Sequence, residues 1–488
     1  MDFHGWEIVG LPDVTVKESK ERIKTAIKNS ITNLLSRKYV INLSPADIRK
    51  EGSLLDLPIA TAILMEIGLI SKKNLNDVAF IGELSLDGRV KKVKGTLAIC
   101  IEAQKLNFKK IIIPKENEKE AKLVKGIEII GISDLSELVN YINNNLHFNN
   151  QFDNVLNIDE LNVNETDFSE FDFANIKGQK DAKRGLEIAV AGQHNVIMSG
   201  IPGSGKTLLA KNLISILPRL DYEEILEILK IKSISENTSD YYDAEKNNLI
   251  IKRPFRAPHH TITQMALIGG GKYPKPGEIT KAHKGILFLD EITEFRDGIL
   301  ESLREPLEEK RIVISRFNNS VTYPCDFMLV AAMNPCKCGF LGSKNRKCTC
   351  SKFEIEKYRN KLSEPFLDRI DIRLDINAID ITEFTSSEEE KSVDIRNRVI
   401  RARKIQAERY KNEGFNVNSK MNQKEIKKYC KLEKRSVELL NKMLSSNIIT
   451  IRGYYKIIKI ARTIADLEEC ENIKHTHILE AIHYKNVR

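Results

Sequence analysis

The chain has 488 residues, 41% hydrophobic and 30% charged, which is the composition of a globular protein with two to four domains. It has no apolar run as long as a membrane span and no signal peptide pattern at its start, so we expect a cytoplasmic protein with no membrane partner. The net charge is +9, and residues 391–488 alone carry 23 Lys and Arg against 11 Asp and Glu. A segment with this excess of positive charge could bind a nucleic acid, although a solvated, lysine-rich helical face has the same composition.

Residues 1–145 form the first region and mix helical with strand patterns. Residues 13–29 have the periodicity of an amphipathic helix, and residues 56–67 form an apolar stretch of helical length. Strands and a hairpin turn are predicted at residues 40–43, 80–84, 87–90 and 110–114. No catalytic cluster is visible, which indicates an α+β or α/β domain. Residues 146–172, rich in Asn, Asp and Glu, follow as a linker.

A phosphate-binding motif begins the second region, residues 173–385. The motif has the pattern GxxxxGK[ST] and consists of Gly200, Ile201, Pro202, Gly203, Ser204, Gly205, Lys206 and Thr207. Residues 194–199 before it have the pattern of a buried strand, and residues 208–217 after it have helical periodicity. This arrangement directs backbone N–H groups and a helix N-terminus at a phosphate chain. We expect Lys206 to reach the β- and γ-phosphates of ATP and Thr207 to bind Mg²⁺.

Two further apolar strands end in polar residues that suit ATP hydrolysis. Residues 285–289 lead to Asp290 and Glu291, and residues 328–333 lead to Asn334. Downstream of a P-loop, Asp290 can bind Mg²⁺, and Glu291 can orient or deprotonate the attacking water. Asn334 can hold that water against the γ-phosphate, although a cap or turn at a strand end explains it equally well when it is taken alone. These motifs together predict a Mg²⁺-dependent ATPase.

Four of the eight cysteines are clustered in the core region. Cys336, Cys338, Cys348 and Cys350 form two CxC pairs with nine residues between them. Four thiolates this close in sequence could complete a tetrahedral, structural Zn²⁺ site, and free thiols are the alternative of equal weight. A catalytic metal is not expected, because four cysteine ligands leave no open coordination position.

Two arginines outside these motifs could contact a nucleotide. Arg369, beyond the core strands, could be supplied to a neighbouring subunit and neutralise charge in the transition state. The alternative for Arg369 is a surface salt bridge with Asp368 or Asp371. Arg452 could reach the nucleotide from a lid, and the alternative is a solvated arginine at a helix start.

Two loops of the core region could line the pore of a ring. Residues 269–276 have the composition of a flexible insertion, and residues 311–323 that of a hairpin with its tip at residues 316–319. Ordinary surface loops have the same composition. His259 and His260 are adjacent and are interpreted as local hydrogen-bonding residues rather than metal ligands.

Residues 386–488 form the third region, which is basic and helical. Segments with helical periodicity lie at residues 392–410, 423–429, 434–444, 453–467 and 476–484. No internal repeat of solenoid length is present.

Five sequence strings connect the chain to one family. They are residues 9–13 (VGLPD), 44–52 (SPADIRKEG), 253–260 (RPFRAPHH), 334–336 (NPC) and 461–467 (ARTIADL). With these strings the chain resembles the magnesium-chelatase-like AAA+ ATPases of the ComM/YifB type over almost its whole length. Long shared strings are far more specific than a P-loop alone.

The resemblance implies an α/β multidomain protein. Its N-terminal α+β domain would be similar to the Lon protease domain and to ribosomal protein S5 domain 2, followed by a AAA+ core and a helical lid. The resemblance also implies a ring, a hexamer, with nucleotide-site roles for Lys206, Thr207, Asp290, Glu291, Asn334, Arg369 as the trans-acting finger and Arg452 as the lid sensor. In the ComM branch it implies ATP-driven motion on DNA, single-stranded or branched, and branch migration during natural transformation.

The chain departs from its relatives in two ways. It begins close to the VGLPD string, where relatives carry an additional segment that supplies early strands, so either the N-terminal sheet is incomplete or the true start lies upstream. A Lon-type protease also needs a serine nucleophile and a lysine base, and Leu54 and Ala98 occupy those positions here. We therefore expect no peptidase activity and a structural or DNA-binding role for this domain.

Taken together, the sequence predicts a ring ATPase that uses Mg·ATP to translocate on or remodel DNA in natural transformation or recombination. One alternative is a protein-remodelling ATPase. Another is a chelatase-type motor subunit that works through a partner protein, which would not require the N-terminal Lon-like domain. DNA-stimulated turnover of ATP distinguishes the first reading from both alternatives.

Overall fold

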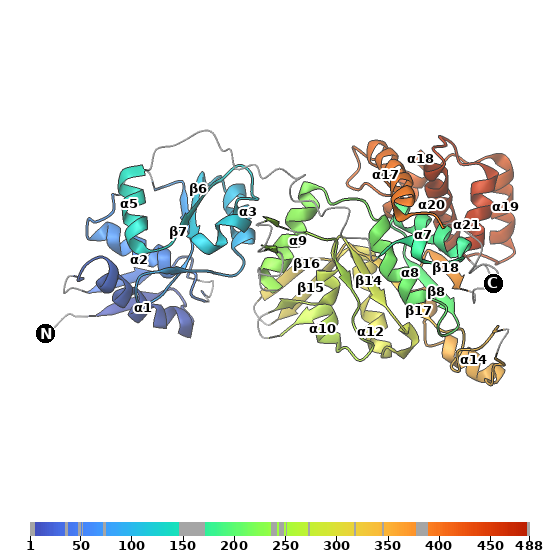
Figure 1. Cartoon of the computed structure of the whole chain (residues 1–488), viewed down its shortest axis with the longest axis horizontal. Helices are drawn as coiled ribbons and strands as arrows, with labels where there is room; N and C mark the ends of the chain where they lie inside the picture. Colours follow the sequence, from blue (N-terminus) through green and yellow to red (C-terminus); the bar gives the residue numbers. More distant parts are fainter. Residues whose placement is uncertain are drawn as a thin grey trace. The chain divides into compact units, whose positions relative to one another are not determined.

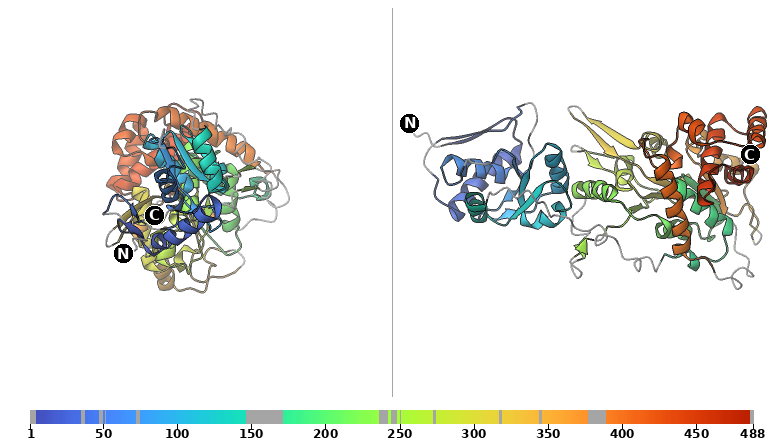
Figure 2. Two further views of the ribbon diagram at one scale, coloured as in Figure 1. Left: turned by 90° about the vertical axis from the view of Figure 1, so that its left-hand side faces the viewer. Right: turned by 90° about the horizontal axis from the view of Figure 1, so that it is seen from above.

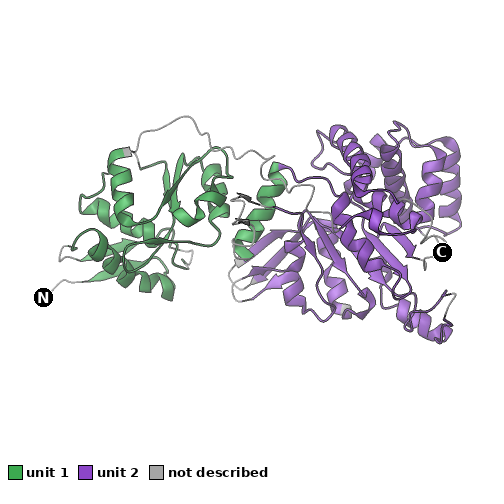
Figure 3. Cartoon of the chain, viewed as in Figure 1, with its two compact units in different colours: residues 1–161, 222–250 green, residues 162–221, 251–488 purple. Residues whose placement is uncertain are grey.

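The computed structural model describes residues 5–34, 38–46, 50, 52–71, 75–145, 171–235, 242–243, 248–249, 251–271, 274–316, 319–343, 346–376 and 389–485. The chain forms two compact units, coloured separately in Figure 3. Unit 1 comprises Met1–Leu161 and Tyr222–Ile250, and unit 2 comprises Asn162–Asp221 and Ile251–Arg488. Almost all of the predicted linker lies outside the described residues. Within the described ranges, no helix is long and apolar enough to cross a bilayer.

Unit 1 is built around a small parallel sheet (Figure 1). The strand order is β3–β6–β7, and the strands are Val78–Phe80, Lys110–Pro114 and Glu128–Ile132. A second parallel pair joins β1 (Trp6–Val9) to β2 (Tyr39–Asn42). The expected hairpin consists of β4 (Glu83–Leu84) and β5 (Val90–Lys91).

The helices of unit 1 pack their apolar faces on these strands. Those within residues 1–145 are α1 (Val14–Ser30), α2 (Asp56–Glu66), α3 (Thr96–Lys105), α4 (Glu118–Ala121) and α5 (Leu135–Asn145). Helix α1 begins where the Asp13 carboxylate accepts the backbone N–H of Val16 at 2.7 Å, a regular N-cap. Ile23, Leu57 and Ile112 are fully buried in the shared core, so α1, α2 and the sheet form one hydrophobic unit.

Helix α9 (Tyr222–Ser235) belongs to unit 1, although the sequence places it inside the second region. The Tyr222 hydroxyl donates to the backbone oxygen of Leu123 at 2.7 Å. The backbone N–H of Gly95 donates to Ser233 at 3.1 Å, at the other end of the helix. Residues 222–250 are therefore an insertion whose described contacts lie with the N-terminal residues.

Unit 2 contains a five-stranded parallel sheet in the order β11–β14–β17–β8–β18. The strands are Phe255–Arg256, Ile286–Leu289, Met328–Met333, Val196–Gly200 and Ile372–Ile376. In this order β17 lies directly beside β8, and β14 lies beside β17 (Figure 1). The carboxyl ends of β8, β14 and β17 therefore meet at one edge, where parallel α/β sheets commonly bind ligands.

Both faces of this sheet are covered, which explains its continuously apolar strands. Along β17, Val330 and Ala332 join one core cluster with helices α7 (Lys180–Gly192) and α8 (Lys206–Asn212). Leu329 and Ala331 join the other cluster, with α12 (Asp297–Ser302) and α13 (Arg304–Glu309). Alternate residues of one strand thus anchor two layers of helices.

The C-terminal residues form helices that gather at one end of unit 2, coloured orange to red in Figures 1 and 2. They are α17 (Ser392–Arg409), α18 (Gln423–Tyr429), α19 (Lys434–Ser445), α20 (Ile451–Leu467) and α21 (His475–Lys485). Each lies within two residues of a predicted helical segment. Inside this group, the buried Asp466 carboxylate lies 2.9 Å from the guanidinium nitrogens of both Arg409 and Arg462.

Two local predictions for unit 2 differ from the structure, and in unit 1 the strand expected at residues 80–84 is divided between β3 and β4. The helix expected at residues 208–217 begins earlier, at Lys206, and changes to a 3₁₀ turn, η4 (Leu213–Ile216), before Pro218. The insertion at residues 269–276 contains a short antiparallel pair, β12 (Gly269–Gly270) with β13 (Lys275–Pro276). The hairpin is present as β15 (Arg311–Arg316) and β16 (Asn319–Pro324), and residues 317–318 at its tip lie outside the described residues.

Candidate functional site

The P-loop connects the carboxyl end of β8 to the start of α8. Gly203 and Gly205 have φ angles of 78° and 88°, in the left-handed region that glycine adopts without strain. A Cβ atom at either glycine would meet no atom within 4 Å, whereas a Cβ at Gly200 would lie 2.5 Å from the backbone oxygen of Ile376. The loop is therefore packed on the sheet at its first glycine and open at its later ones.

Lys206 lies at the centre of the site. Its Nζ donates to the backbone oxygens of Gly200 at 2.6 Å and Ile201 at 3.0 Å, and to Asn334 Oδ1 at 3.3 Å. Burial lowers the pKa of Lys206, and the carboxylates of Asp290 and Glu291 oppose that effect by favouring the charged form. The ammonium is thus bonded to neutral oxygens, which leaves its charge available to an anion.

Thr207 and Asp290 form a pair of oxygen ligands beside Lys206. The Thr207 hydroxyl donates to Asp290 Oδ2 at 2.8 Å, which connects the start of α8 to the end of β14. The other carboxylate oxygen of Asp290 accepts the backbone N–H of Glu291 at 3.0 Å. Hydroxyl and carboxylate oxygens are the ligands that Mg²⁺ prefers. The two residues therefore fit a magnesium site next to a phosphate.

One hydroxyl in the P-loop has no partner among the described residues. Ser204 is 6% exposed, and its Oγ is buried without a hydrogen bond. An unpaired buried polar atom costs free energy, so such atoms are rare unless a ligand or water completes them. Its position between Gly203 and Gly205 places this unpaired atom in the phosphate-binding loop.

Glu291 adopts a left-handed conformation, with φ of 48°, directly after Asp290. Its side chain is exposed, and its carboxylate lies 3.7 Å from the ring nitrogen Nδ1 of His260. No motif in the sequence pairs these two residues, and only the RPFRAPHH string draws attention to His260. The neighbouring His259 bonds to Thr261 at 2.9 Å, a local hydrogen bond as predicted.

Arg369 lies just after α15 (Glu364–Leu367), outside the cluster formed by Lys206 and its partners. Its guanidinium pairs with Glu308 of α13 at 2.5 Å, not with Asp368 or Asp371. Its side chain is 10% exposed, and its Nε has no hydrogen-bond partner among the described atoms. The structure therefore does not bring Arg369 to the P-loop of its own chain.

Arg452 lies in the first turn of α20, one residue inside the helix. Its side chain is 64% exposed, and its Nη1 lies 3.6 Å from a carboxylate oxygen of Asp368. Asp368 directly precedes Arg369 in the chain. The two predicted arginines therefore lie in the same region of unit 2, and among the described residues no hydrogen bond or ion pair joins either one to Lys206 or Asp290.

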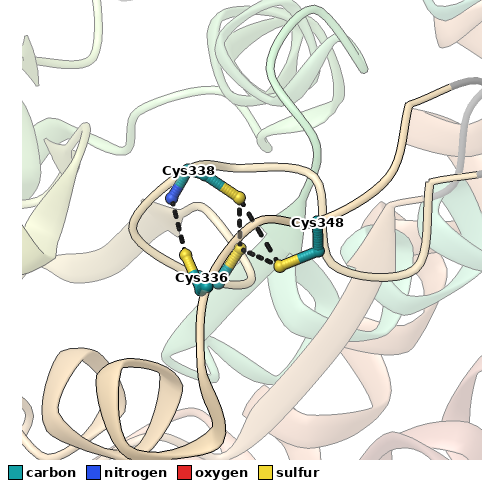
Figure 4. Close-up of side chains that lie close together, drawn as sticks. Cys336, Cys338 and Cys348 are labelled. Atoms are coloured by element: carbon teal, nitrogen blue, oxygen red, sulfur yellow. Dashed lines mark hydrogen bonds between the residues drawn. The ribbon is translucent and has the colours of Figure 1, made fainter.

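The four clustered cysteines converge in space. Their sulfur atoms all lie within 4.8 Å of one another, and Figure 4 shows Cys336, Cys338 and Cys348 turned toward a common centre. The loop that carries them begins after Asn334, the residue that contacts Lys206. A single residue, Pro335, therefore separates Asn334 of the P-loop site from the first cysteine of the cluster.

Comparisons with known proteins identify the family. A family model described as magnesium chelatase, subunit ChlI, matches residues 172–384, and related models match residues 2–117 and 389–485. Competence protein ComM of Haemophilus influenzae is 38% identical over 486 residues, which are 99% of this chain and 92% of that protein. The chain belongs to the ComM/YifB-type magnesium-chelatase-like family. YifB of Escherichia coli, with 37% identity over the same shares, is another relative.

Membership of this family agrees with the mixed α/β architecture and indicates a AAA+ ATPase that uses ATP and Mg²⁺. The match to magnesium-chelatase subunit ChlI of Bigelowiella natans is weaker, at 24% identity over 29% of this chain. However, a ChlI model also matches residues 2–117. The N-terminal region alone therefore does not argue against a chelatase-type protein, contrary to the expectation from sequence.

Proposed function

We propose that this protein is a Mg²⁺-dependent ATPase that works as a ring, a hexamer, and moves or remodels DNA. One observation carries the proposal. Lys206, Thr207, Asp290 and Asn334, from three neighbouring strand ends, are joined by hydrogen bonds of 2.8–3.3 Å around one P-loop. The biological setting is natural transformation or recombination, by analogy with the competence protein ComM.

The residues present fit Mg·ATP. The open P-loop backbone would cradle the phosphates, and Lys206 would exchange its carbonyl partners for phosphate oxygens. Thr207 and Asp290 would hold Mg²⁺, which supplies charge neutralisation on the β- and γ-phosphates. The Ser204 hydroxyl, which lacks a partner, would gain one from the bound phosphate chain.

Glu291 would orient and deprotonate the water that attacks the γ-phosphate. Its exposed carboxylate at the strand end can accept a proton, and His260 at 3.7 Å can hold that carboxylate in place. Asn334 would hold the same water or a γ-phosphate oxygen. Glu291, Asn334 and Lys206 would thus act on the same phosphate group.

Arg369 would act on the nucleotide of a neighbouring subunit. Its guanidinium pairs with Glu308, whose side chain is 53% exposed and easily displaced. Arg452 would report from the lid, since its partner Asp368 is adjacent to Arg369. ATP hydrolysis would thereby depend on contact between subunits.

Basic surfaces would hold the DNA. Residues 391–488 carry a net charge of +12 from 23 Lys and Arg against 11 Asp and Glu, which suits a phosphate backbone. The β12–β13 pair and the β15–β16 hairpin are the candidate pore loops. Unit 1 would be structural or DNA-binding rather than proteolytic, because Leu54 and Ala98 replace the nucleophile and base of a Lon-type protease.

The test is an ATPase assay with single-stranded, duplex and branched DNA at several salt concentrations, with Lys206→Ala as the control for contaminating ATPase. We expect DNA to accelerate turnover and the acceleration to weaken with salt. Turnover that responds to an unfolded protein but not to DNA would support a protein-remodelling ATPase instead. Turnover that responds to neither would leave the chelatase-type motor, and an absence of turnover would remove the catalytic proposal.

A further inference from the structure

The cysteine cluster lies in a long loop with little hydrophobic support. The described residues between β17 and α14 (Lys352–Arg359) form neither helix nor strand, and Cys336 is their only fully buried apolar side chain. Irregular loops of this length are uncommon in compact domains, and those that are ordered are usually functional. The four thiols are therefore the main candidates for the groups that hold this loop in its conformation.

The geometry points to a structural Zn²⁺ bound by Cys336, Cys338, Cys348 and Cys350. The sulfur atom of Cys336 lies 3.4 Å from that of Cys338 and 3.6 Å from that of Cys348, and Cys338 and Cys348 are 3.5 Å apart. In a tetrahedral site with Zn–S bonds of about 2.3 Å, neighbouring sulfurs lie about 3.8 Å apart. The backbone N–H of Cys338 donates to the sulfur of Cys350 at 3.4 Å, a bond that stabilises a thiolate.

Other uses of four thiols fit these distances less well. A disulfide requires sulfurs about 2.05 Å apart, and all four cysteines are free thiols. In an iron–sulfur cluster the four thiolates bind different iron atoms, so they would not all lie at the edge length of one tetrahedron. A single metal with four sulfur ligands accounts for the observed spacing.

A second group of potential ligands in unit 2 serves as a useful contrast. Glu468, Cys470 and His477 also lie within 4.8 Å of one another. However, His477 Nδ1 accepts the backbone N–H of Lys474 at 3.0 Å, so Nε2 carries the proton and donates to Glu468 at 3.0 Å. Both ring nitrogens are occupied by hydrogen bonds, which leaves this group without an imidazole ligand.

Both ends of the cysteine loop are fixed to the proposed ATP site. Asn334 precedes Cys336 by two residues and contacts Lys206. After the loop, Tyr358 of α14 accepts the Thr293 hydroxyl at 2.6 Å, two residues beyond Glu291. The zinc would therefore hold Asn334 and the Glu291 segment in position from outside the nucleotide site.

The middle of the loop also packs on the P-loop itself. A Cβ atom at Gly339 would lie 2.7 Å from the Pro202 side chain, so the backbone of Gly339 packs closely on the Pro202 ring. Gly339 follows Cys338 directly. The metal is thus a positioning element for ATP hydrolysis. This positioning role rests on the proposed ATPase function, whereas the binding of zinc by the four cysteines does not.

Metal analysis of the purified full-length protein tests the site independently of activity. We expect about one zinc per chain, retained by Cys470→Ser and lost in the double variant Cys348→Ser, Cys350→Ser. After exchange, Co²⁺ should show the intense visible bands of tetrahedral thiolate coordination. Protein that carries no stoichiometric metal and has all four thiols open to a thiol reagent would overturn the proposal, and so would stoichiometric iron.

The link to hydrolysis is tested on the same samples. Removal of zinc by a thiol-reactive reagent, followed by reduction, should lower kcat at least tenfold, while the affinity for a fluorescent ATP analogue changes little. Restoring Zn²⁺ should restore kcat. Equal kcat with and without zinc would refute the positioning role but not the proposal that the four cysteines bind zinc. A zinc-loaded protein without ATPase activity would instead count against the ATPase proposal.

Discussion

The ammonium of Lys206 lies 3.3 Å from the side-chain oxygen of Asn334, although 128 residues separate them in the chain. Lys206 starts the helix after β8, and Asn334 follows the adjacent strand β17. This contact therefore connects the P-loop with the residue that we propose to contact the γ-phosphate. It also connects that loop with the cysteine cluster two residues later.

Asn334→Ala should reduce kcat for ATP about 100-fold, the usual cost of removing one preorganised polar group from a reacting centre. The affinity for ATP should change little, because the P-loop and Lys206 remain. Lys206→Ala, in contrast, should lose nucleotide binding as well. Steady-state turnover together with titration of a fluorescent nucleotide separates the two effects. Equal turnover in Asn334→Ala and wild type would remove Asn334 from the site.

Arg369→Ala should retain nucleotide binding and lose about a thousandfold in kcat, because a trans-acting arginine contributes at least that much. The matched control is Arg304→Ala. Arg304 is exposed, lies on the same helix as Glu308, and pairs with Glu301 at 2.6 Å. The control should hydrolyse ATP normally.

Mixing subunits tests whether Arg369 acts in trans. Equal amounts of Lys206→Ala and Arg369→Ala protein should regain part of the activity, because some sites then combine an intact Lys206 with an intact Arg369 from the neighbour. Each variant alone should show at most the residual turnover expected for Arg369→Ala. A mixture as inactive as its components would indicate that Arg369 acts within its own chain or only through Glu308.

Gly339→Ala should raise the KM for ATP, because the added methyl group would meet Pro202 in the P-loop at 2.7 Å. Gly339 also has φ of 85°, where an alanine is strained, so a control must carry the same strain. Gly342→Ala provides it, since Gly342 has φ of 82° and no atom within 4 Å of its Cβ position. A similar KM in the two variants would show that the contact with Pro202 does not matter for ATP.

Asp326→Asn should destabilise unit 2 by about 3 kcal/mol, because it leaves the partly buried lysines around it without their carboxylate. Asp326 lies 2.7 Å from Lys420 and 3.5 Å from Lys284. Burial acts to raise the pKa of Asp326, and these lysines, together with Lys310, outweigh it and hold that pKa well below its usual range. Chemical denaturation at pH 7 measures the difference, and Glu301→Gln, at an exposed pair, is the control.

The same variant predicts a dependence on pH. A carboxylate whose pKa is depressed in the folded state stabilises fully above its unfolded pKa of about 4 and loses that contribution as the pH falls through the folded value. The difference in free energy of unfolding between wild type and Asp326→Asn should therefore stay constant from about pH 7 to pH 5 and become smaller below about pH 4. A gap that widens in acid would contradict this assignment.

Much of the local structure followed from the sequence. The C-terminal helices have apolar residues at helical spacing, and β8, β14 and β17 are apolar strands bounded by glycine or polar residues, so local patterns defined them. The P-loop is a contiguous motif, and its backbone conformation depends on glycines within it. The pair of CxC motifs likewise indicated where a metal could bind.

The sequence alone could not reveal the contacts between segments that are far apart in the chain. Nothing local to Tyr222 predicts that α9 packs on Leu123 of unit 1, nor does any motif pair Arg369 with Glu308 or His260 with Glu291. These contacts arise from strand order and packing, which bring together residues far apart in the chain. The sequence by itself thus determined the chemistry available at each position. The tertiary structure decided which groups act on one another, because hydrogen bonds and ion pairs form only between atoms that the fold brings close together.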